Sequence, residues 1–488
     1  MTTASEANAT HDAVQTELRQ RLARVLNPRC IAVVGDKQVR NYSWLKSLKP
    51  FTGSLYSVQV DEREIPGIEE LGIKNFPALA DIPEPIDFVV CAAPRTVTPH
   101  IVRDCIAVGA GGIALFTSGF SEHGDDQGKQ LEHELIQLAR DARLPLIGPN
   151  CMGLHIPRLG VCFSTDQPVQ AGGDIAFISQ SGTHGLNFSL GAALHGLYCS
   201  TLVSFGNGAV LEAADYLDYF ADDDTTAVIG MYIEGVRDGP RFARVLRDVA
   251  RRKPVVVWKG GQTEVGKRAT LSHTASLTTN SRVWNALVKQ AGAIPVDSLD
   301  EMLDVVKALR RPRPTTGRRI ALAAMTGGQS VVIADDFAKA GFEIPLFSAA
   351  SSARLREFVN VIGGSAENPL DLVNTVLYDA TAVRRVLDIL NEDPKIDAIA
   401  FEVSAYIMHG RWARDPALLE ELLDTVAAFN RASTKTFAVI IYPGHVEAKA
   451  ADVRDALQQR GVATYPTFAR AATALAKAIA FQAARAES

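Results

Sequence analysis

The sequence of 488 residues lacks the marks of secreted and zinc-binding proteins. Its six cysteines show no CxxC spacing, and Cys30 and Cys91 lie in apolar runs that are typical of interior strands. The first ten residues are polar and have neither the cationic start nor the apolar core of a signal peptide. We therefore expect a protein of the reducing cytoplasm without a metal site.

Charge of one sign is also missing. The 50 Lys and Arg residues are balanced by 55 Asp and Glu residues, so we expect no nucleic-acid partner. Residues 175–211 carry no charged side chain and are long enough to cross a bilayer, but they contain six glycines and several polar residues. We expect them to form two buried strands around a helix, and we expect no membrane partner.

Three familiar site motifs are incomplete. Residues 35–41 follow an apolar run but hold a single glycine, where a dinucleotide-binding turn has three. Gly261–Lys267 matches the start of a P-loop, but Arg268 stands where a magnesium-binding hydroxyl is needed. Residues 179–182 lack the first glycine of a serine-hydrolase elbow. We therefore expect no nicotinamide site, no true P-loop and no serine nucleophile.

Short apolar runs alternate with segments of helical period along almost the whole chain, which predicts an α/β fold of parallel sheets with crossover helices. At about 150 residues per domain, the length predicts roughly three doubly wound domains. The expected organisation is a lead-in helix within 1–27, a first domain over 28–153, a second over 154–311, a linker over 312–317 and a third over 318–488. The expected strands are 30–35, 54–60, 88–94, 112–117, 145–147, 175–179, 202–205, 228–233, 255–259, 294–296, 320–324, 344–347, 398–403, 437–441 and 464–465.

Four polar loops follow predicted strands, at the edge where open parallel sheets bind ligands. They cover residues 148–153, 179–185, 270–276 and 325–330. Two of them open helices, whose first amides and dipoles attract phosphate. The turn over 35–41 adds Lys37 and Arg40, which would suit a nucleotide pyrophosphate or form a solvated basic turn.

Only two of the ten histidines, His273 and His184, lie in these loops. A neutral imidazole is a good nucleophile toward phosphoryl groups, and a carboxylate on its other nitrogen fixes the tautomer. Glu234, at the end of the strand over 228–233, is the candidate carboxylate. The alternative for either histidine is a structural hydrogen bond.

Six motifs in the same order together resemble the ADP-forming acyl-CoA synthetases, relatives of succinyl-CoA synthetase. They are GPNCMG at 148–153, ISQSGTHG at 178–185, IEGVRDG at 233–239, SHTASLTT at 272–279, TGGQ at 326–329 and ENPLDL at 367–372. The resemblance implies a Rossmann-like CoA-binding domain followed by two flavodoxin-like domains of the succinyl-CoA-synthetase type. It implies that a phosphohistidine carries phosphate between an acyl phosphate and ADP.

The resemblance also assigns roles to residues. His273 is the implied phosphohistidine and Glu234 orients it. The implied phosphate-binding residues are Ser181, Gly182, Thr183, Gly327 and Gly328. The implied residues at the CoA and acyl end are Gly35, Lys37, Arg40, Pro94, Asn150 and Cys151.

This chain departs from the family pattern in three respects. The CoA turn has less glycine than usual, and Ala275, Ser276, Thr278 and Thr279 follow the histidine where the family is commonly rich in Gly and Ala. The resemblance includes no ATP-grasp domain, so we expect ATP or ADP with Mg²⁺ to bind a partner β subunit in a hetero- or homo-oligomer. The expected reaction makes acyl-CoA from a carboxylic acid and CoA.

Two other functions remain open on this scaffold, namely an ATP-independent acyl-CoA hydrolase or transferase and a non-catalytic CoA-binding regulator. The nature of the acid is also open. Four aromatic residues would either shape a pocket for an aromatic acid or pack in the core. They are Phe205, Tyr232, Trp258 and Trp284.

Overall fold

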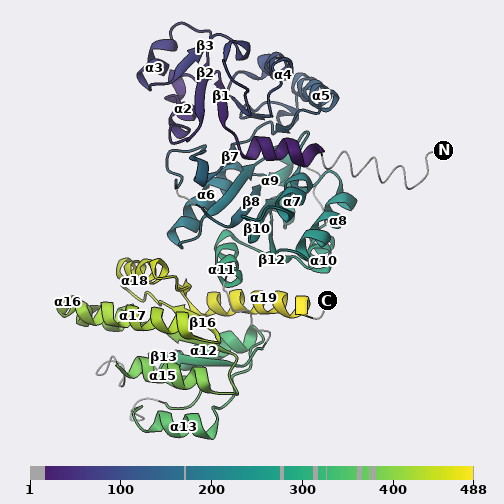
Figure 1. Cartoon of the computed structure of the whole chain (residues 1–488). Helices are drawn as coiled ribbons and strands as arrows, with labels where there is room; N and C mark the ends of the chain where they lie inside the picture. The colour runs from purple at the N-terminus through teal and green to yellow at the C-terminus, as the bar shows by residue number, and fades with distance from the viewer. Residues whose placement is uncertain are drawn as a thin grey trace. The chain divides into compact units, whose positions relative to one another are not determined.

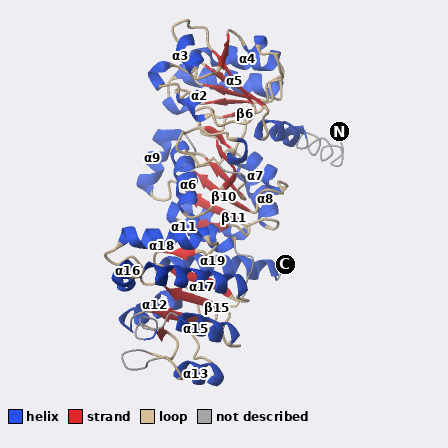
Figure 2. Cartoon of the chain, turned by 60° about the vertical axis from the view of Figure 1, so that its left-hand side comes forward, coloured by secondary structure: helices blue, strands red, loops and turns tan. Residues whose placement is uncertain are grey.

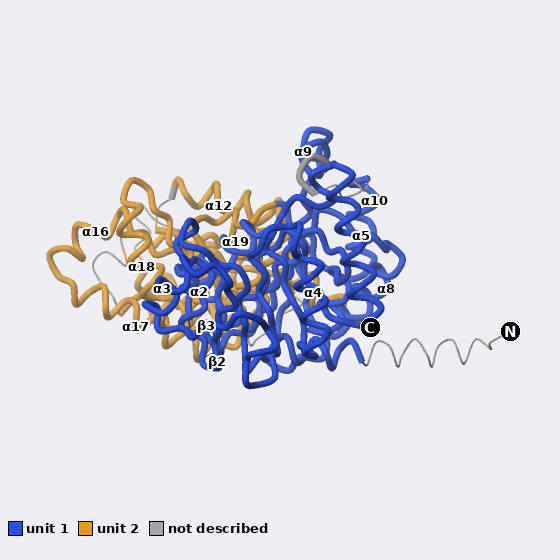
Figure 3. Tube along the Cα trace, turned by 90° about the horizontal axis from the view of Figure 1, so that it is seen from above, with its two compact units in different colours: residues 1–193, 197–297 blue, residues 194–196, 298–488 orange. Residues whose placement is uncertain are grey.

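The computed structural model describes residues 17–169, 172–274, 280–310, 317–325, 327–359, 365–372, 375 and 381–486, with the side chains of 271–274 and 327 excepted. The chain divides into two compact units (Figure 3). The first unit contains residues 1–193 and 197–297, and the second contains residues 194–196 and 298–488.

The first sheet has six parallel strands in the order β3-β2-β1-β4-β5-β6, which is the Rossmann order. Its central strands are continuous apolar runs, because helices cover both faces (Figures 1 and 2). The strands are β1 (Cys30–Val34), β2 (Ser54–Val58), β3 (Lys74–Phe76), β4 (Phe88–Cys91), β5 (Ile113–Leu115) and β6 (Leu146–Ile147). Helices α2 (Ser43–Ser47) and α3 (Ile65–Glu70) flank one face, and α4 (Thr98–Ala107) and α5 (Asp126–Asp141) flank the other.

The second sheet, in the order β12-β11-β10-β8-β9-β7, has five parallel strands in flavodoxin order and the antiparallel edge strand β7. The strands are β7 (Gly153–His155), β8 (Ile175–Ser179), β9 (Cys199–Ser204), β10 (Val228–Ile233), β11 (Val255–Lys259) and β12 (Ile294–Val296). The helices are α6 (Gly182–Leu194), α7 (Ala213–Ala221), α8 (Gly239–Ala250), α9 (Glu264–Thr274) and α10 (Ser281–Gln290).

Two local predictions for this sheet are corrected. No strand was predicted over 153–155, but these residues form β7, which pairs antiparallel with β9. The expected polar loop over 270–274 is instead the last turn of α9, where the hydroxyl of Thr270 donates to the carbonyl of Gly266 at 3.1 Å. The prediction for residues 175–211 is confirmed, since they contain β8, α6 and β9. None of the helices in the described parts of the chain has the length and hydropathy to span a membrane.

The third sheet, in the second unit, repeats the flavodoxin order as β14-β13-β15-β16-β17. The strands are β13 (Ile320–Ala324), β14 (Leu370–Asp371), β15 (Ala398–Glu402), β16 (Thr436–Ile440) and β17 (Thr464–Tyr465). The helices are α11 (Leu299–Leu309), α12 (Gly327–Lys339), α13 (Ala349–Arg356), α15 (Thr381–Glu392), α16 (Ala405–Arg414), α17 (Pro416–Ala432), α18 (Glu447–Gln459) and α19 (Phe468–Ala486). Helix α11 packs against α19 within this unit, although the predicted second domain extends to residue 311.

The strand predicted over 344–347 is wrong. Only Glu343 forms a β-bridge there, with Arg319, and the chain then leads into α13. The short strand β14 takes the edge position instead. The side chain of Asn368 prepares that position, because its amide accepts from the N–H of Leu322 at 3.0 Å and donates to the carbonyl of Ile320 at 2.9 Å.

The helix over 17–26 confirms the described part of the predicted lead-in helix. Arg19 on this helix forms a bidentate ion pair with Asp218 on α7, at 2.7 Å and 2.9 Å. Arg24, on the same helix, binds Asp87, the residue before β4, at 2.7 Å. The helix therefore joins the first and second sheets inside one unit.

Candidate functional site

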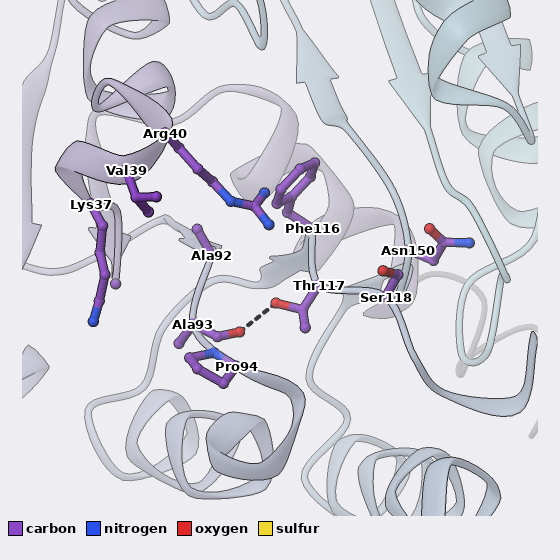
Figure 4. A pocket seen from close by; sticks show the side chains of 11 residues that line it. Lys37, Val39, Arg40, Ala92, Ala93, Pro94, Phe116, Thr117, Ser118 and Asn150 are labelled. Atoms are coloured by element: carbon purple, nitrogen blue, oxygen red, sulfur yellow. Dashed lines mark hydrogen bonds between the residues drawn. The ribbon is translucent and has the colours of Figure 1, made fainter. Parts of the chain in front are cut away.

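A pocket of about 410 Å³ lies at the carboxyl ends of β1, β4 and β5 (Figure 4). Strands β1 and β4 are neighbours across the point where the strand order reverses, which is where doubly wound sheets bind ligands. Five residues that the sequence assigned to the CoA and acyl end line this pocket: Gly35, Lys37, Arg40, Pro94 and Asn150. The other lining residues are Val39, Ala92, Ala93, Phe116, Thr117 and Ser118.

The wall of this first pocket depends on a close approach between two strand ends. Gly35 has a φ of +80°, and a Cβ atom there would lie 2.9 Å from the Cβ of Ala93. The guanidinium of Arg40 lies over the ring of Phe116, 4.9 Å from its centroid. The pocket thus combines a wall that contains Gly35 with two basic side chains, Lys37 and Arg40, which suits an anionic ligand.

Asp36 builds the turn beside this pocket, a role that the sequence analysis missed. Its side chain is buried at 2% exposure and accepts from the N–H groups of Lys37, Trp44 and Leu45 at 3.0 Å. Burial raises the pKa of Asp36, although the three amides oppose that shift. The signal in the sequence was an aspartate directly after the strand-ending glycine.

A second pocket of about 270 Å³ adjoins the first and shares Phe116 and Asn150 with it. It brings together residues from two separate predicted loops, namely Asn150 and Cys151 from one and Ser181, Gly182 and Thr183 from the other. The remaining lining residues are Met152, Gln180 and Leu186. None of its nine lining residues carries a charged side chain.

The loop after β6 holds Asn150 in a left-handed conformation, with a φ of +55°. Its N–H donates to the carbonyl of Thr117 at 3.0 Å, and Gly206 passes so close that a Cβ there would lie 2.2 Å from the carbonyl oxygen of Asn150. The neighbouring thiol of Cys151 is buried, and burial raises its pKa to about 12. Cys151 is therefore a wall of the pocket and no thiolate nucleophile.

The amino end of α6 opens into the second pocket. Ser181 begins the helix, because its hydroxyl accepts from the N–H of His184 at 3.3 Å. Gly182 and Thr183, the next two residues, line the pocket. The positive end of the helix dipole therefore points toward any anion held there, an effect worth about 0.3–1 kcal/mol per interaction.

Glu234 lies at the carboxyl end of β10, between β8 and β11, and is 6% exposed. The hydroxyl of Tyr232 donates to its Oε1 at 3.2 Å. Its main chain is bound by two neighbours, since its N–H donates to the side-chain oxygen of Gln180 at 2.8 Å and its carbonyl accepts from Nζ of Lys259 at 2.7 Å. Glu234 is thus a fixed carboxylate at the same sheet edge as the start of α6.

His184 packs in an aromatic cluster beside Glu234. Its ring centroid lies 4.3 Å from that of Tyr232 and 4.6 Å from that of Trp258. Burial lowers the pKa of His184, so the imidazole is neutral at neutral pH. Trp284 likewise stacks on Phe242. None of the four aromatic residues proposed for an acid pocket lines either pocket, which favours their role in core packing.

The other predicted phosphate-site residues are described only in part. The backbone of His273 lies in the last turn of α9, which follows β11, but its side chain and residues 275–279 lie outside the described parts of the chain. Gly327 and Gly328 begin α12 in the second unit, and Thr326 lies outside the described residues.

A second missed residue, Glu402, lies beside the start of α12. It is fully buried, its Oε2 accepts from the N–H of Met325 at 2.8 Å, and burial raises its pKa to about 7. Glu402 is the last residue of β15, and its apolar neighbours gave no sign of this hydrogen bond.

Two family models match the chain. A CoA binding domain matches residues 37–157, and a succinyl-CoA ligase like flavodoxin domain matches residues 172–309. These matches fall on the first and second sheets, which hold both pockets.

Individual relatives extend the likeness over almost the whole chain. The alpha subunit of acetate–CoA ligase [ADP-forming] II from Pyrococcus furiosus is 31% identical over 445 residues, which cover 90% of this chain and 93% of the relative. Acetate–CoA ligase [ADP-forming] I from Archaeoglobus fulgidus is 34% identical over 384 residues, or 78% of this chain and 54% of the relative. The chain therefore spans about half the length of that larger ligase.

A solved structure agrees with these sequence matches. It is that of the dinucleotide forming acetyl-coenzyme A synthetase 1 of Ca. Korarchaeum cryptofilum in complex with phosphate and ADP. It has a TM-score of 0.80 and 28% identity, with 95% of this chain and 97% of that chain covered. The chain belongs to the family of ADP-forming acyl-CoA synthetases and corresponds in extent to their alpha subunits.

Proposed function

We propose that the chain is the CoA-binding and acyl-transfer subunit of an ADP-forming acyl-CoA synthetase in the cytoplasm. The observation that carries the proposal is the pair of adjoining pockets, one at the Rossmann switch point and one at the start of α6, with Phe116 and Asn150 common to both. Such a pair suits a reaction that brings a CoA thiol to an acyl phosphate.

In the proposed reaction, a carboxylate oxygen attacks the phosphorus carried by His273, the P–N bond breaks, and an acyl phosphate forms. The CoA sulfur then attacks the acyl carbon, the C–O bond to phosphate breaks, and acyl-CoA and inorganic phosphate are released. The thiol proton leaves with phosphate or solvent. The reverse sequence would phosphorylate His273 from acyl-CoA and phosphate.

The residues take separate parts in this scheme. Gly35, Lys37, Arg40 and Pro94 bind CoA, with the two cations facing its phosphates. Asn150 and Cys151 border the acyl group, and Ser181, Gly182 and Thr183 bind the phosphoryl oxygens at the start of α6. Glu234 orients His273. Gly327 and Gly328, which begin α12, are the remaining residues proposed to bind phosphate.

The nucleotide step requires a further component in this proposal. A β subunit with an ATP-grasp domain would bind ATP or ADP with Mg²⁺ and exchange phosphate with His273. Co-purification of the chain from its native host would identify this companion and the resulting hetero-oligomer.

The half-reaction tests the proposal without nucleotide. The chain, alone and with its co-purified companion, is incubated with an acyl-CoA and radiolabelled phosphate. We expect an acid-labile, base-stable label on the protein that is absent from His273→Ala and retained by the control His133→Ala, whose side chain is exposed on α5. Acyl-CoA turnover without phosphate would indicate the hydrolase or transferase, and CoA binding without label or turnover would indicate the regulator.

A further inference from the structure

The peptide groups around Glu234 are held from both flanking strands. Strands β8, β10 and β11 are consecutive in the sheet, and Tyr232, two residues before Glu234, pairs with Ser179 on one side and Trp258 on the other. A strand has no further ladder partners beyond its end, so residues there move more than those within the sheet. Glu234 lies just beyond the end of β10.

Gln180 holds this end from the β8 side. Its side-chain oxygen accepts from the N–H of Glu234 at 2.8 Å and from the N–H of Gly235 at 3.0 Å. Its own N–H donates to the carbonyl of Tyr232 at 3.0 Å. Gln180 is 5% exposed, and the same residue lines the second pocket.

Lys259 holds the end from the β11 side. Its ammonium donates to the carbonyls of Glu234, at 2.7 Å, and of Gly260, and it lies 5.6 Å from the ring centroid of Trp284. In the described parts of the chain, the charged groups that act on it are Glu234 and Lys267. A buried ammonium forms charge-assisted hydrogen bonds, which are stronger than neutral ones.

We propose that Gln180 and Lys259 are positioning residues that clamp the main chain of Glu234 and so fix its carboxylate for the phosphohistidine step. The inference rests on the proposed function. Small displacements of an orienting group reduce rates strongly, by up to about 100-fold for a shift of about 1 Å. Because Gln180 also lines the second pocket, it connects the space for the acid to the carboxylate that orients His273.

Two variants test the clamp, each against a matched control. Gln180→Ala and Lys259→Met remove its two sides. Gln167 is the control for Gln180, because its buried side-chain oxygen also accepts from two main-chain N–H groups, those of Phe163 and Ser164. Lys253 is the control for Lys259, because its Nζ also donates to two carbonyls, those of Phe220 and Asp223.

The measured quantities are the maximal rate of His273 phosphorylation from acyl-CoA and phosphate and the KM for acyl-CoA. We expect Gln180→Ala and Lys259→Met to lower the maximal rate about 10- to 100-fold with less than about a threefold change in KM. Gln167→Ala and Lys253→Met should stay within about twofold of the native rate. Thermal unfolding of each variant identifies any that fails to fold.

Lys259→Met tests the clamp if Gln180→Ala does not fold, whereas Gln180→Glu keeps the acceptor oxygen for both amides and should retain a maximal rate close to that of the native chain. The added negative charge beside Glu234 should move the acidic limb of the pH profile to higher pH, which a purely structural role would not do. Native rates in folded Gln180→Ala and Lys259→Met would overturn the clamp, and so would an unchanged pH profile in folded Gln180→Glu. Absence of label in the native chain and its complex would overturn the proposed function itself.

Discussion

The second and third sheets share one strand order, but their central glutamates act in opposite ways. Glu234 follows β10 and Glu402 ends β15, and both strands are the middle one of five in flavodoxin order. At Glu234, the side chain of a neighbouring loop binds the main chain of the glutamate. At Glu402, the glutamate side chain binds the main chain of the neighbouring loop at Met325.

This reversal separates a chemical role from a structural one. At Glu234 other residues hold the main chain, and the carboxylate, which accepts from the hydroxyl of Tyr232, is the group proposed to orient His273. A fully buried carboxyl that holds the turn before α12 is committed to that turn, and burial raises its pKa to about 7. The same residue type at the same topological position therefore does not imply the same function.

The largest expected difference is in the rate of His273 phosphorylation, when each glutamate in turn is replaced by glutamine. Glu234→Gln should lower the maximal rate of His273 phosphorylation by about 100- to 10,000-fold, as expected when an imidazole loses the carboxylate that sets its tautomer. Glu402→Gln retains an acceptor for the N–H of Met325 and should stay within about threefold of the native rate. Equal losses in the two variants would break the distinction.

A smaller effect concerns stability against pH. The pKa of Glu402 is about 7 in the folded chain and 4.5 as its ordinary value, so the folded state binds more protons between these values. The free energy of unfolding of the second unit should therefore fall as pH rises from about 4.5 to 7, by roughly 1–3 kcal/mol.

Urea unfolding of the full chain at pH 5 and pH 8 measures this change. In Glu402→Gln the change in the free energy of unfolding between pH 5 and pH 8 should be smaller than in the native chain, since the amide does not titrate. A native chain whose midpoint is the same at both pH values would contradict the assignment of a buried, proton-binding Glu402.

The smallest expected effects come from alanine substitutions at the starts of α6 and α12. A Cβ on Gly182 would lie 2.5 Å from Cγ of Met152, whereas a Cβ on Gly328 would meet no atom within 4 Å. Gly182→Ala should displace Met152 in the second pocket and raise the KM for the acid about threefold. Gly328→Ala should raise the free energy of unfolding by up to about 1 kcal/mol, because alanine favours a helix. Steady-state kinetics and urea unfolding distinguish the two.

Much of the fold was predictable, because buried parallel strands are continuous apolar runs. Residues 175–179, 228–233 and 255–259 match β8, β10 and β11 at both ends. Strands β3, β7 and β14 were missed because their sequences, KNF, GLH and LD, contain no apolar run. Such short strands form by pairing with a neighbouring strand, and a single sequence does not show which segments pair.

The site was predictable as a set of loops and not as a network of hydrogen bonds. Asn150 and Ser181 meet in one pocket because the loop after β6 runs directly into β7, which pairs with β9 beside β8. Gln180 accepts from main-chain amides 54 and 55 residues further along the chain, which no local pattern records. The last turn of α9 was missed because a run of small polar residues is typical of both a loop and a helix end.

The helix over 17–26 acts as a strap, a segment that connects the domain of the first sheet to the domain of the second. Arg19 binds Asp218 on α7, and Arg24, five residues later, binds Asp87 just before β4. Cutting the chain at residue 28 to isolate a CoA-binding domain would discard this strap and expose Leu22, Val25 and Leu26, all now covered. Any fragment designed to report on CoA binding should therefore retain both the strap and the second sheet.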